Sequence, residues 1–300
     1  MHRSNPKVFV IAETKQSSAG SLAYLREIGA ITNMLNPPPD DFTTDAKSGG
    51  EWLIEVAGRS CYRSFKPQLN KNVKRVREGN KEYIGNILNQ KHGSVLEHAS
   101  VTFACTDVSR IFTHELVRHR AGVAISQESG RYVRIDDIGI FKPTCFTAEW
   151  LEQNVVPFAN RDTAQTDSPQ EHANYLSQTI LSDIASKVVS DERFIEDWSA
   201  KFDLDHPKMP FHVKKELTSA LRRFVAGGLA TSIIFTANHR AIRHMIAMRT
   251  AEGAEEEIRI VFHMIAMQMQ KMYTALYQDM SFEPVEGSDV PVAVFKNEKV

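Results

Sequence analysis

The chain lacks the features of a secreted or membrane-spanning protein. Its three cysteines, Cys61, Cys105 and Cys145, are odd in number and widely spaced. They offer neither a disulfide framework nor a CxxC metal pair. No apolar run approaches the roughly 18 residues of a membrane span, and the run at residues 8–12 is too short for a signal peptide. We therefore expect a soluble cytoplasmic protein.

Neither sign of charge is in excess, because 36 Lys and Arg residues stand against 37 Asp and Glu, a net charge of −1. A protein that binds nucleic acid electrostatically is usually basic over a whole face, so this balance argues against one. A zinc enzyme is also disfavoured, since His114 and His119 are not at i, i+4 spacing and no cysteine pair assists them. We expect no metal, nucleic acid or membrane partner.

One segment has a strong local asymmetry of charge. Residues 217–251 contain no Asp, Glu or Lys but hold Arg222, Arg223, Arg240, Arg243 and Arg249. These arginines stand in apolar sequence, and burying an unpaired charge costs on the order of several kcal/mol. The acidic residues at 252–257 could neutralise one or two of them. A phosphorylated ligand is the simpler source of anions for the rest.

A second cluster of hydrogen-bonding side chains lies between Arg118 and Tyr132. It contains Arg118-His119-Arg120 and then Ser126-Gln127-Glu128-Ser129-Gly130-Arg131. Guanidinium groups match phosphate oxygens bidentately and stay charged at working pH. The pattern indicates a phosphate site, and a solvated basic face is the alternative.

Hydrophobic periodicity predicts an α+β protein. Residues 7–12 and the alternating residues 99–106 are typical of strands, the second half-buried in a mostly antiparallel sheet with Cys105 as a core thiol. Helices are predicted at residues 110–119, 171–189 and 255–277, and loops at residues 159–171 and 201–210. We expect a single domain over residues 1–283, its central sheet flanked by helices, and a flexible C-terminal tail over residues 284–300.

Four ordered motifs resemble the flavin-dependent thymidylate synthases. They are the Ser94–His98 segment, Arg118-His119-Arg120 with Ser129-Gly130-Arg131-Tyr132, the segment 222–231, and Asn238-His239-Arg240-Ala241 with Met248-Arg249. The resemblance covers roughly residues 52–276. It implies FAD as cofactor, NADPH as reductant and methylenetetrahydrofolate as one-carbon donor, with dUMP converted to dTMP. It also implies a homotetramer with shared active sites.

The resemblance assigns roles residue by residue. Arg249 matches the arginine that stabilises the uracil anion at the N3–C4 edge; a pairing with Glu252 or Glu256 is the structural alternative. The positions matching flavin contacts are His98, Ser100, Arg118, His119, Arg120, Asn238, Arg240 and His244. Those matching the surroundings of the nucleotide are Arg110, Glu115, Arg118, Gln127, Glu128, Ser129, Gly130, Arg131, Arg222 and Arg249. Ser129 is interpreted as a hydrogen-bond donor, because no base is placed by sequence to activate it.

Two positions depart from the family pattern. Eight residues separate Arg120 from Ser129, where the family usually has seven, and Gly253 stands where a histidine is common. The longer spacing leaves open a UMP-methylating homologue, because the loop could make room for a 2′-hydroxyl. A non-catalytic nucleotide or RNA binder is a further alternative. A conventional thymidylate synthase is rejected, since none of the three cysteines has the basic local setting that activates a thiol.

Overall fold

A computed structural model describes residues 2–32, 38–73, 75–132, 139–158, 168–297 and 300. The chain divides into two compact units. Unit 1 contains Met1–Lys7, Cys105–Leu116 and Ser126–Ile233, and unit 2 contains Val8–Ala104, Val117–Ile125 and Ile234–Val300. The prediction of one domain over residues 1–283 stays a prediction.

The central sheet has four antiparallel strands in the order β2-β3-β6-β4. These are β2 (Lys7–Glu13), β3 (Ser100–Ser109), β6 (Ala230–Asn238) and β4 (Val123–Gln127). Alternate residues of β3 are buried, including Phe103 and Cys105, as the period of two predicts. Burial raises the pKa of the Cys105 thiol to about 12, which confirms it as a core thiol. The predicted α+β fold class is therefore confirmed.

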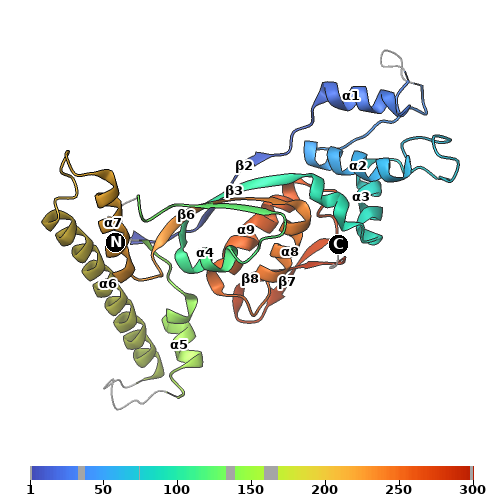
Figure 1. The fold of residues 1–300 in the computed structure, drawn as a ribbon. Coiled ribbons are helices and arrows are strands. Elements are labelled where there is room, and N and C mark those ends of the chain that lie inside the picture. Colours follow the sequence, from blue (N-terminus) through green and yellow to red (C-terminus); the bar gives the residue numbers. More distant parts are fainter. Residues whose placement is uncertain (1, 33–37, 74, 133–138, 159–167, 298–299) are drawn as a thin grey trace. The chain divides into compact units, whose positions relative to one another are not determined.

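Unit 2 packs helices and a hairpin around its part of this sheet (Figure 1). The Phe103 and Phe235 rings stack at 5.0 Å, and Phe262 of α9 lies 6.5 Å from Phe235. Helices α8 (His239–Arg249) and α9 (Glu256–Met272) contact each other, and both contact β8 (Ser288–Phe295), which pairs with β7 (Met280–Val285). The unit also contains α1 (Ser18–Glu27), α2 (Gly49–Tyr62), α3 (Asn80–Asn89) and the 3₁₀ helix η1 (Gly93–His98).

Unit 1 is mainly helical. Its longest element, α6 (Pro169–Lys201), begins with a capping box in which Ser168 and Glu171 bond each other's backbone N–H groups. Val188 of α6 packs on Leu229, and Ala173 packs on α5 (Ala148–Asn154) and Val156. The other elements are β1 (His2–Arg3), β5 (Gly139–Ile140), α4 (Arg110–Leu116), η2 (Thr144–Phe146), α7 (Phe211–Leu221) and η4 (Arg222–Phe224).

The three predicted helices all need corrected boundaries. Helix α4 ends at Leu116 and not at residue 119, so the Arg118-His119-Arg120 triplet follows the helix and precedes a turn at Gly122, where φ is 70°. Helix α6 extends beyond the predicted 171–189 in both directions, because the capping box starts it earlier and its polar residues continue it to Lys201. The predicted loop at 159–171 lies largely outside the described residues.

Helix α9 ends at Met272, five residues before the predicted boundary. The buried carboxylate of Glu51 accepts a hydrogen bond from the backbone N–H of Ala275 at 2.8 Å, and Tyr273 donates its hydroxyl to Glu13. The Glu51 carboxylate thus replaces the helical acceptor of the Ala275 N–H, while the Tyr273 N–H still donates to the Met269 carbonyl at 2.9 Å. Tyr273 and Leu276 are buried, as the periodicity predicted, but from a non-helical segment.

The predicted flexible tail over residues 284–300 is wrong for residues 284–295. They complete a β7–β8 hairpin through a turn at Gly287, where φ is 73°, and they bury Ala293 and Phe295. The backbone N–H of Ala293 donates to Thr250 Oγ1 at 2.9 Å, which fixes β8 on the end of α8. No helix in the described part of the chain is long and apolar enough to span a membrane.

Candidate active site

The junction of β6 and α8 in unit 2 is fixed by Asn238. Its side-chain oxygen caps the helix by accepting from the Ala241 N–H at 2.9 Å, and its own N–H donates to the Gly122 carbonyl at 3.1 Å. A Cβ at Gly122 would lie 2.4 Å from the Asn238 Nδ2 atom. The helix cap thus occupies Oδ1 of Asn238, and Nδ2 is the atom this side chain can offer to a ligand.

Arg240 follows on the first turn of α8 and already has an anionic partner. Its Nη1 lies 2.6 Å from Glu97 Oε1 of η1, and its Nε donates to the Val300 carbonyl at 3.2 Å. Both side chains are about half exposed, so this ion pair contributes little to stability. The contact holds the Arg240 guanidinium in a defined place beside the 3₁₀ helix.

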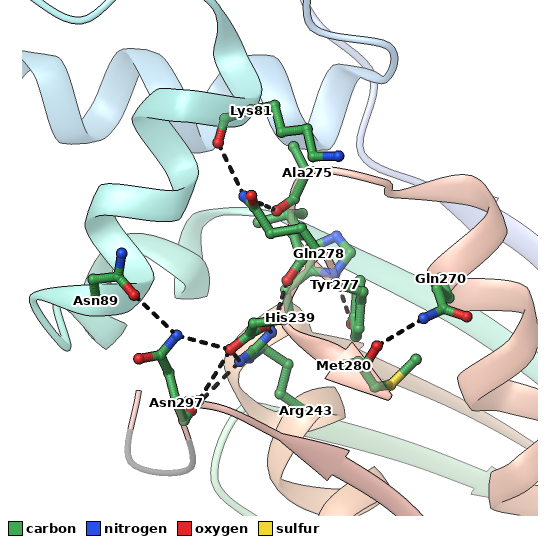
Figure 2. Close-up of polar contacts among 12 residues, drawn as sticks. Lys81, Asn89, His239, Arg243, Gln270, Ala275, Tyr277, Gln278, Met280 and Asn297 are labelled. Atoms are coloured by element: carbon green, nitrogen blue, oxygen red, sulfur yellow. Dashed lines mark hydrogen bonds and ion pairs between the residues drawn. The ribbon is translucent and has the colours of Figure 1, made fainter. Parts of the chain in front are cut away.

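Arg243 has a stronger internal partner. It is 5% exposed and makes a two-point ion pair with Asp279, Nη1–Oδ1 at 2.8 Å and Nη2–Oδ2 at 2.9 Å. Burial would raise the pKa of Asp279, but Arg243 and Asn297 overcome that effect and the pKa is lowered. Figure 2 shows Arg243 and Asn297 in this network. The expectation that the buried arginines need an external anion is therefore wrong for Arg243, whose partner Asp279 lies far away in the sequence. Arg240 has only the exposed Glu97 as an anionic partner.

His119, His244 and Arg249 lie together in unit 2. Arg249 donates from Nε to His119 Nε2 at 2.8 Å, and the rings of His119 and His244 are 6.2 Å apart at 79°. An imidazole nitrogen that accepts from a guanidinium carries no proton, so this bond assigns the neutral ring with its proton on Nδ1. The resemblance assigns His119 and His244 to the flavin and Arg249 to uracil. The structure brings the three together from the loop after α4 and from α8.

A cavity of about 460 Å³ lies against this region of unit 2. Among the predicted flavin residues it is lined by Asn238, Arg240 and His244. Its other lining residues are Glu97, Ala121, Gly122, Ala241, Arg243, Phe295, Asn297 and Val300. Its size, its guanidinium groups and its mixed polar and apolar wall fit part of a dinucleotide cofactor.

Two more arginines converge in unit 1. A Cβ at Gly130 would lie 3.1 Å from Arg110 Nη2 and 3.5 Å from Arg222 Cδ. Partial burial lowers the pKa of Arg110, the nearby Arg222 lowers it further, and Glu128 raises it. Two like charges over a bare glycine are stabilised by an anion placed between them, so this arrangement fits a phosphate group.

Most of the other predicted nucleotide residues of unit 1 lie next to Gly130 in the sequence. Gln127 ends β4, the backbone N–H of Glu128 donates to Ser232, and Ser129 forms a turn in which its carbonyl accepts from Tyr132. The guanidinium of Arg131 lies 5.9 Å from the Tyr132 ring centroid. Glu115 lies on α4 of unit 1, whereas Arg118 belongs to unit 2.

The predicted flavin residues all belong to unit 2, including His98 at the end of η1, Ser100 at the start of β3, and Arg120. Most of the predicted nucleotide residues belong to unit 1. Sequence analysis missed Arg243, Phe295 and Asn297 as cavity residues, and quoted Glu97 only as part of a motif. The alternation of valines before Phe295 was the available signal for β8. In the described part of the chain, no group of three or more His, Cys, Asp or Glu side chains is placed to hold a metal ion.

The α+β fold, the cavity beside Asn238 and Arg240 and the paired guanidinium groups of unit 1 are chemically suited to anionic ligands. The chain belongs to the family described as "Thymidylate synthase complementing protein", whose model matches residues 44–273. It is 33% identical over 270 residues to the flavin-dependent thymidylate synthase of Mycobacterium tuberculosis, a match covering 90% of this chain and 95% of the relative.

Two other relatives carry the same name. The Mycobacterium avium protein is 32% identical over 279 residues, covering 92% of this chain and 98% of its own length. The Mycobacteroides abscessus protein is 29% identical over 265 residues, covering 88% and 93%. The chain is thus a homologue of flavin-dependent thymidylate synthases, which are enzymes.

Proposed function

We propose that this chain methylates C5 of the uracil ring in dUMP to give dTMP. Methylenetetrahydrofolate supplies the carbon, and NADPH supplies hydride through bound FAD. The observation that carries the proposal is the cavity of about 460 Å³ lined by Asn238, Arg240 and His244, within a chain of this family. The flavin supplies the redox chemistry when bound, and the residues supply binding, orientation and charge stabilisation.

The arginine pair of unit 1 gives a reason for nucleotide binding. Arg110 and Arg222 converge over Gly130, and the 5′-phosphate of dUMP is the anion that would relieve their repulsion. The backbone turn at Ser129 offers polar groups beside that phosphate. These contacts would orient the nucleotide without any nucleophile from the protein.

Arg249 would act on the uracil ring. Its guanidinium, which His119 contacts at Nε, would face the N3–C4 side of uracil. A fixed positive charge there stabilises the anion that develops as N3 loses its proton. His119 is then a positioning residue for Arg249.

The test combines ligand binding with turnover. Saturating FAD, at about 100 times its dissociation constant, should raise the free energy of unfolding by roughly 2.7 kcal/mol. The protein should then convert dUMP to dTMP with NADPH and methylenetetrahydrofolate. Flavin binding without turnover of either dUMP or UMP would reduce the proposal to a non-catalytic binder. Failure to bind flavin would end it.

UMP is the second candidate substrate, favoured by the eight residues between Arg120 and Ser129. Ala121 and Gly122 of this stretch line the cofactor cavity, and β4 begins directly afterwards at Val123. Apart from Gln127 and Glu128, this stretch offers no clear group for recognising a 2′-hydroxyl, so we expect dUMP to be the better substrate. We expect the enzyme to prefer dUMP over UMP by about 10²-fold or less, because a pocket cannot strongly reject a substrate that merely adds a hydroxyl. Competition between the two nucleotides measures it.

The homotetramer with shared active sites and the cytoplasmic location also belong to this proposal. Light scattering gives the oligomeric state. Inactive Arg249→Ala and Arg131→Ala proteins should recover some activity on mixing and subunit exchange, provided that the two arginines of one site come from different chains.

A further inference from the structure

The β7–β8 hairpin brings residues from outside the family match to the cofactor cavity. The family model ends at residue 273, and Phe295 and Asn297 line the cavity together with Asn238, Arg240 and His244. Neither residue belongs to the motifs that the family resemblance supplied. A cofactor bound in the cavity would touch a wall built from this C-terminal segment.

This wall is held in place by the Arg243–Asp279 ion pair. Asn297 donates to Asp279 Oδ2 from its backbone N–H at 3.2 Å and from Nδ2 at 3.0 Å. The Arg243 guanidinium lies over the Phe295 ring at 4.3 Å from its centroid, and its Nη1 also donates to the Leu276 carbonyl at 2.7 Å. Figure 2 shows Asn297 linked to Asn89 and lying beside Arg243. The cavity wall is therefore rigid and preorganised.

The charge of this wall is already balanced. Asp279 neutralises Arg243. Arg240, which also lines the cavity, is about half exposed, and its anionic partner Glu97 is exposed to the same degree. The diphosphate of the cofactor would therefore be attracted to the Arg240 guanidinium. The wall of Arg243, Phe295 and Asn297 suits an uncharged planar ring instead.

The amide of Asn297 indicates which ring. Its Nδ2 donates to Asp279 Oδ2 and to Asn89 Oδ1, the latter at 3.4 Å. These two donations assign the other atom of the amide as the oxygen, which can accept a hydrogen bond from a ligand. Among the described residues no hydrogen bond reaches this Oδ1. A carbonyl oxygen accepts from an exocyclic amine such as the amino group of adenine.

The reacting end of the flavin is expected elsewhere. His98, which the family resemblance assigns to the flavin, and Arg249, to which the proposed function gives uracil, are not among the residues that line this cavity. Resting on that proposed function, we propose that Asn297 and Phe295 bind the adenosine half of FAD. Asp279 is a positioning residue that keeps both in place.

The test compares FAD with FMN, which lacks the adenosine half. Asn297→Ala should weaken FAD binding by about tenfold, the loss of one buried hydrogen bond, and change FMN binding by less than about twofold. The matched control is Asn89→Ala, which removes the same link to Nδ2 from an exposed residue outside the cavity and should leave both affinities unchanged. An equal loss of FAD and FMN affinity, or no loss at all, would overturn the proposal.

A measurement on the wild-type protein guards against a variant that fails to fold. AMP should compete with FAD for the protein and should not compete with FMN. If AMP does not compete with FAD, the inference is overturned. It is also overturned if Asn297→Ala loses affinity for NADPH and keeps its affinity for FAD, because the residue would then bind the adenosine of NADPH. If wild-type protein binds neither FAD nor FMN, the proposed function has failed before this inference is reached.

Discussion

Arg249 and His119 are joined by a hydrogen bond of 2.8 Å between two side chains 130 residues apart in the sequence. The bond fixes both the orientation of the guanidinium and the tautomer of the imidazole. The sequence alone also allowed Arg249 to pair only with Glu252 or Glu256. The bond to His119 shows that such a pairing would not account for all contacts of Arg249.

Arg249→Lys should lower kcat by about tenfold or more while changing the KM for dUMP only a few-fold. Lysine keeps the charge but loses the planar fork and the Nε–H that His119 accepts. Steady-state kinetics on dUMP measure both constants. Arg75→Lys, at an exposed surface ion pair, is the control and should behave as wild type. A kcat within about twofold of wild type would show that Arg249 does not stabilise the uracil anion.

Gly130→Ala should raise the KM for dUMP by roughly three- to tenfold with little effect on stability. The new methyl group would press on Arg110 Nη2 at 3.1 Å, and a flexible guanidinium can move by a few tenths of an ångström, away from the phosphate. Gly228→Ala, where a Cβ meets nothing within 4 Å, is the matched control. An unchanged KM in Gly130→Ala would remove the phosphate from this position.

Local pattern predicted those elements whose residues repeat with one period. The strand at residues 99–106 was predicted because alternate side chains face the core, and the burial of Phe103 and Cys105 confirms it. Helix ends were predicted less well. Shortly after the end of α9, the N–H of Ala275 donates to Glu51, which lies more than 200 residues away in the sequence. Such acceptors leave no mark in the local sequence.

The charged residues show the same limit. The lack of acidic residues at 217–251 predicted arginines without an anionic partner in the protein. The fold instead pairs Arg243 with Asp279 and Arg240 with Glu97, which lie outside that segment. Arg110 and Arg222 do meet as like charges, so the expectation of an external anion holds best there. The residues that the motifs predict to contact flavin all lie in one unit, but the cavity wall at Phe295 and Asn297 lies beyond those motifs.

Gly122→Ala should weaken FAD binding by about tenfold or more and also lower stability. Gly122 has a φ of 70°, and a Cβ there would lie 2.4 Å from Nδ2 of Asn238, the atom that this residue can offer to the cofactor. Fluorescence titration of FAD gives the affinity. Gly253→Ala, with no neighbour within 4 Å, should change neither quantity. Wild-type affinity in Gly122→Ala would place the cofactor away from Asn238.

The last prediction concerns His239, which is fully buried between Asn238 and Arg240. Burial and the nearby Arg243 lower its pKa to about 3, and its Nδ1 lies 3.1 Å from the Tyr277 hydroxyl. Figure 2 shows the two side chains in contact. Because the unfolded chain takes up a proton near pH 6.5 and the folded chain does not, the stabilising contribution of neutral His239 is present above that pH. It is lost progressively as the pH falls toward 3.

Between pH 7 and pH 5 this residue alone should therefore remove about 2 kcal/mol from the free energy of unfolding. In His239→Phe, which cannot be protonated, the decline over the same interval should be smaller by that amount, even if the variant is less stable at pH 7. Urea unfolding at several pH values measures the slope. His212→Gln, at an exposed position, should keep the wild-type slope. Equal slopes for His239→Phe and wild type would mean that His239 is accessible to protons in the folded protein, and that the packing of α8 against Tyr277 is looser than these contacts indicate.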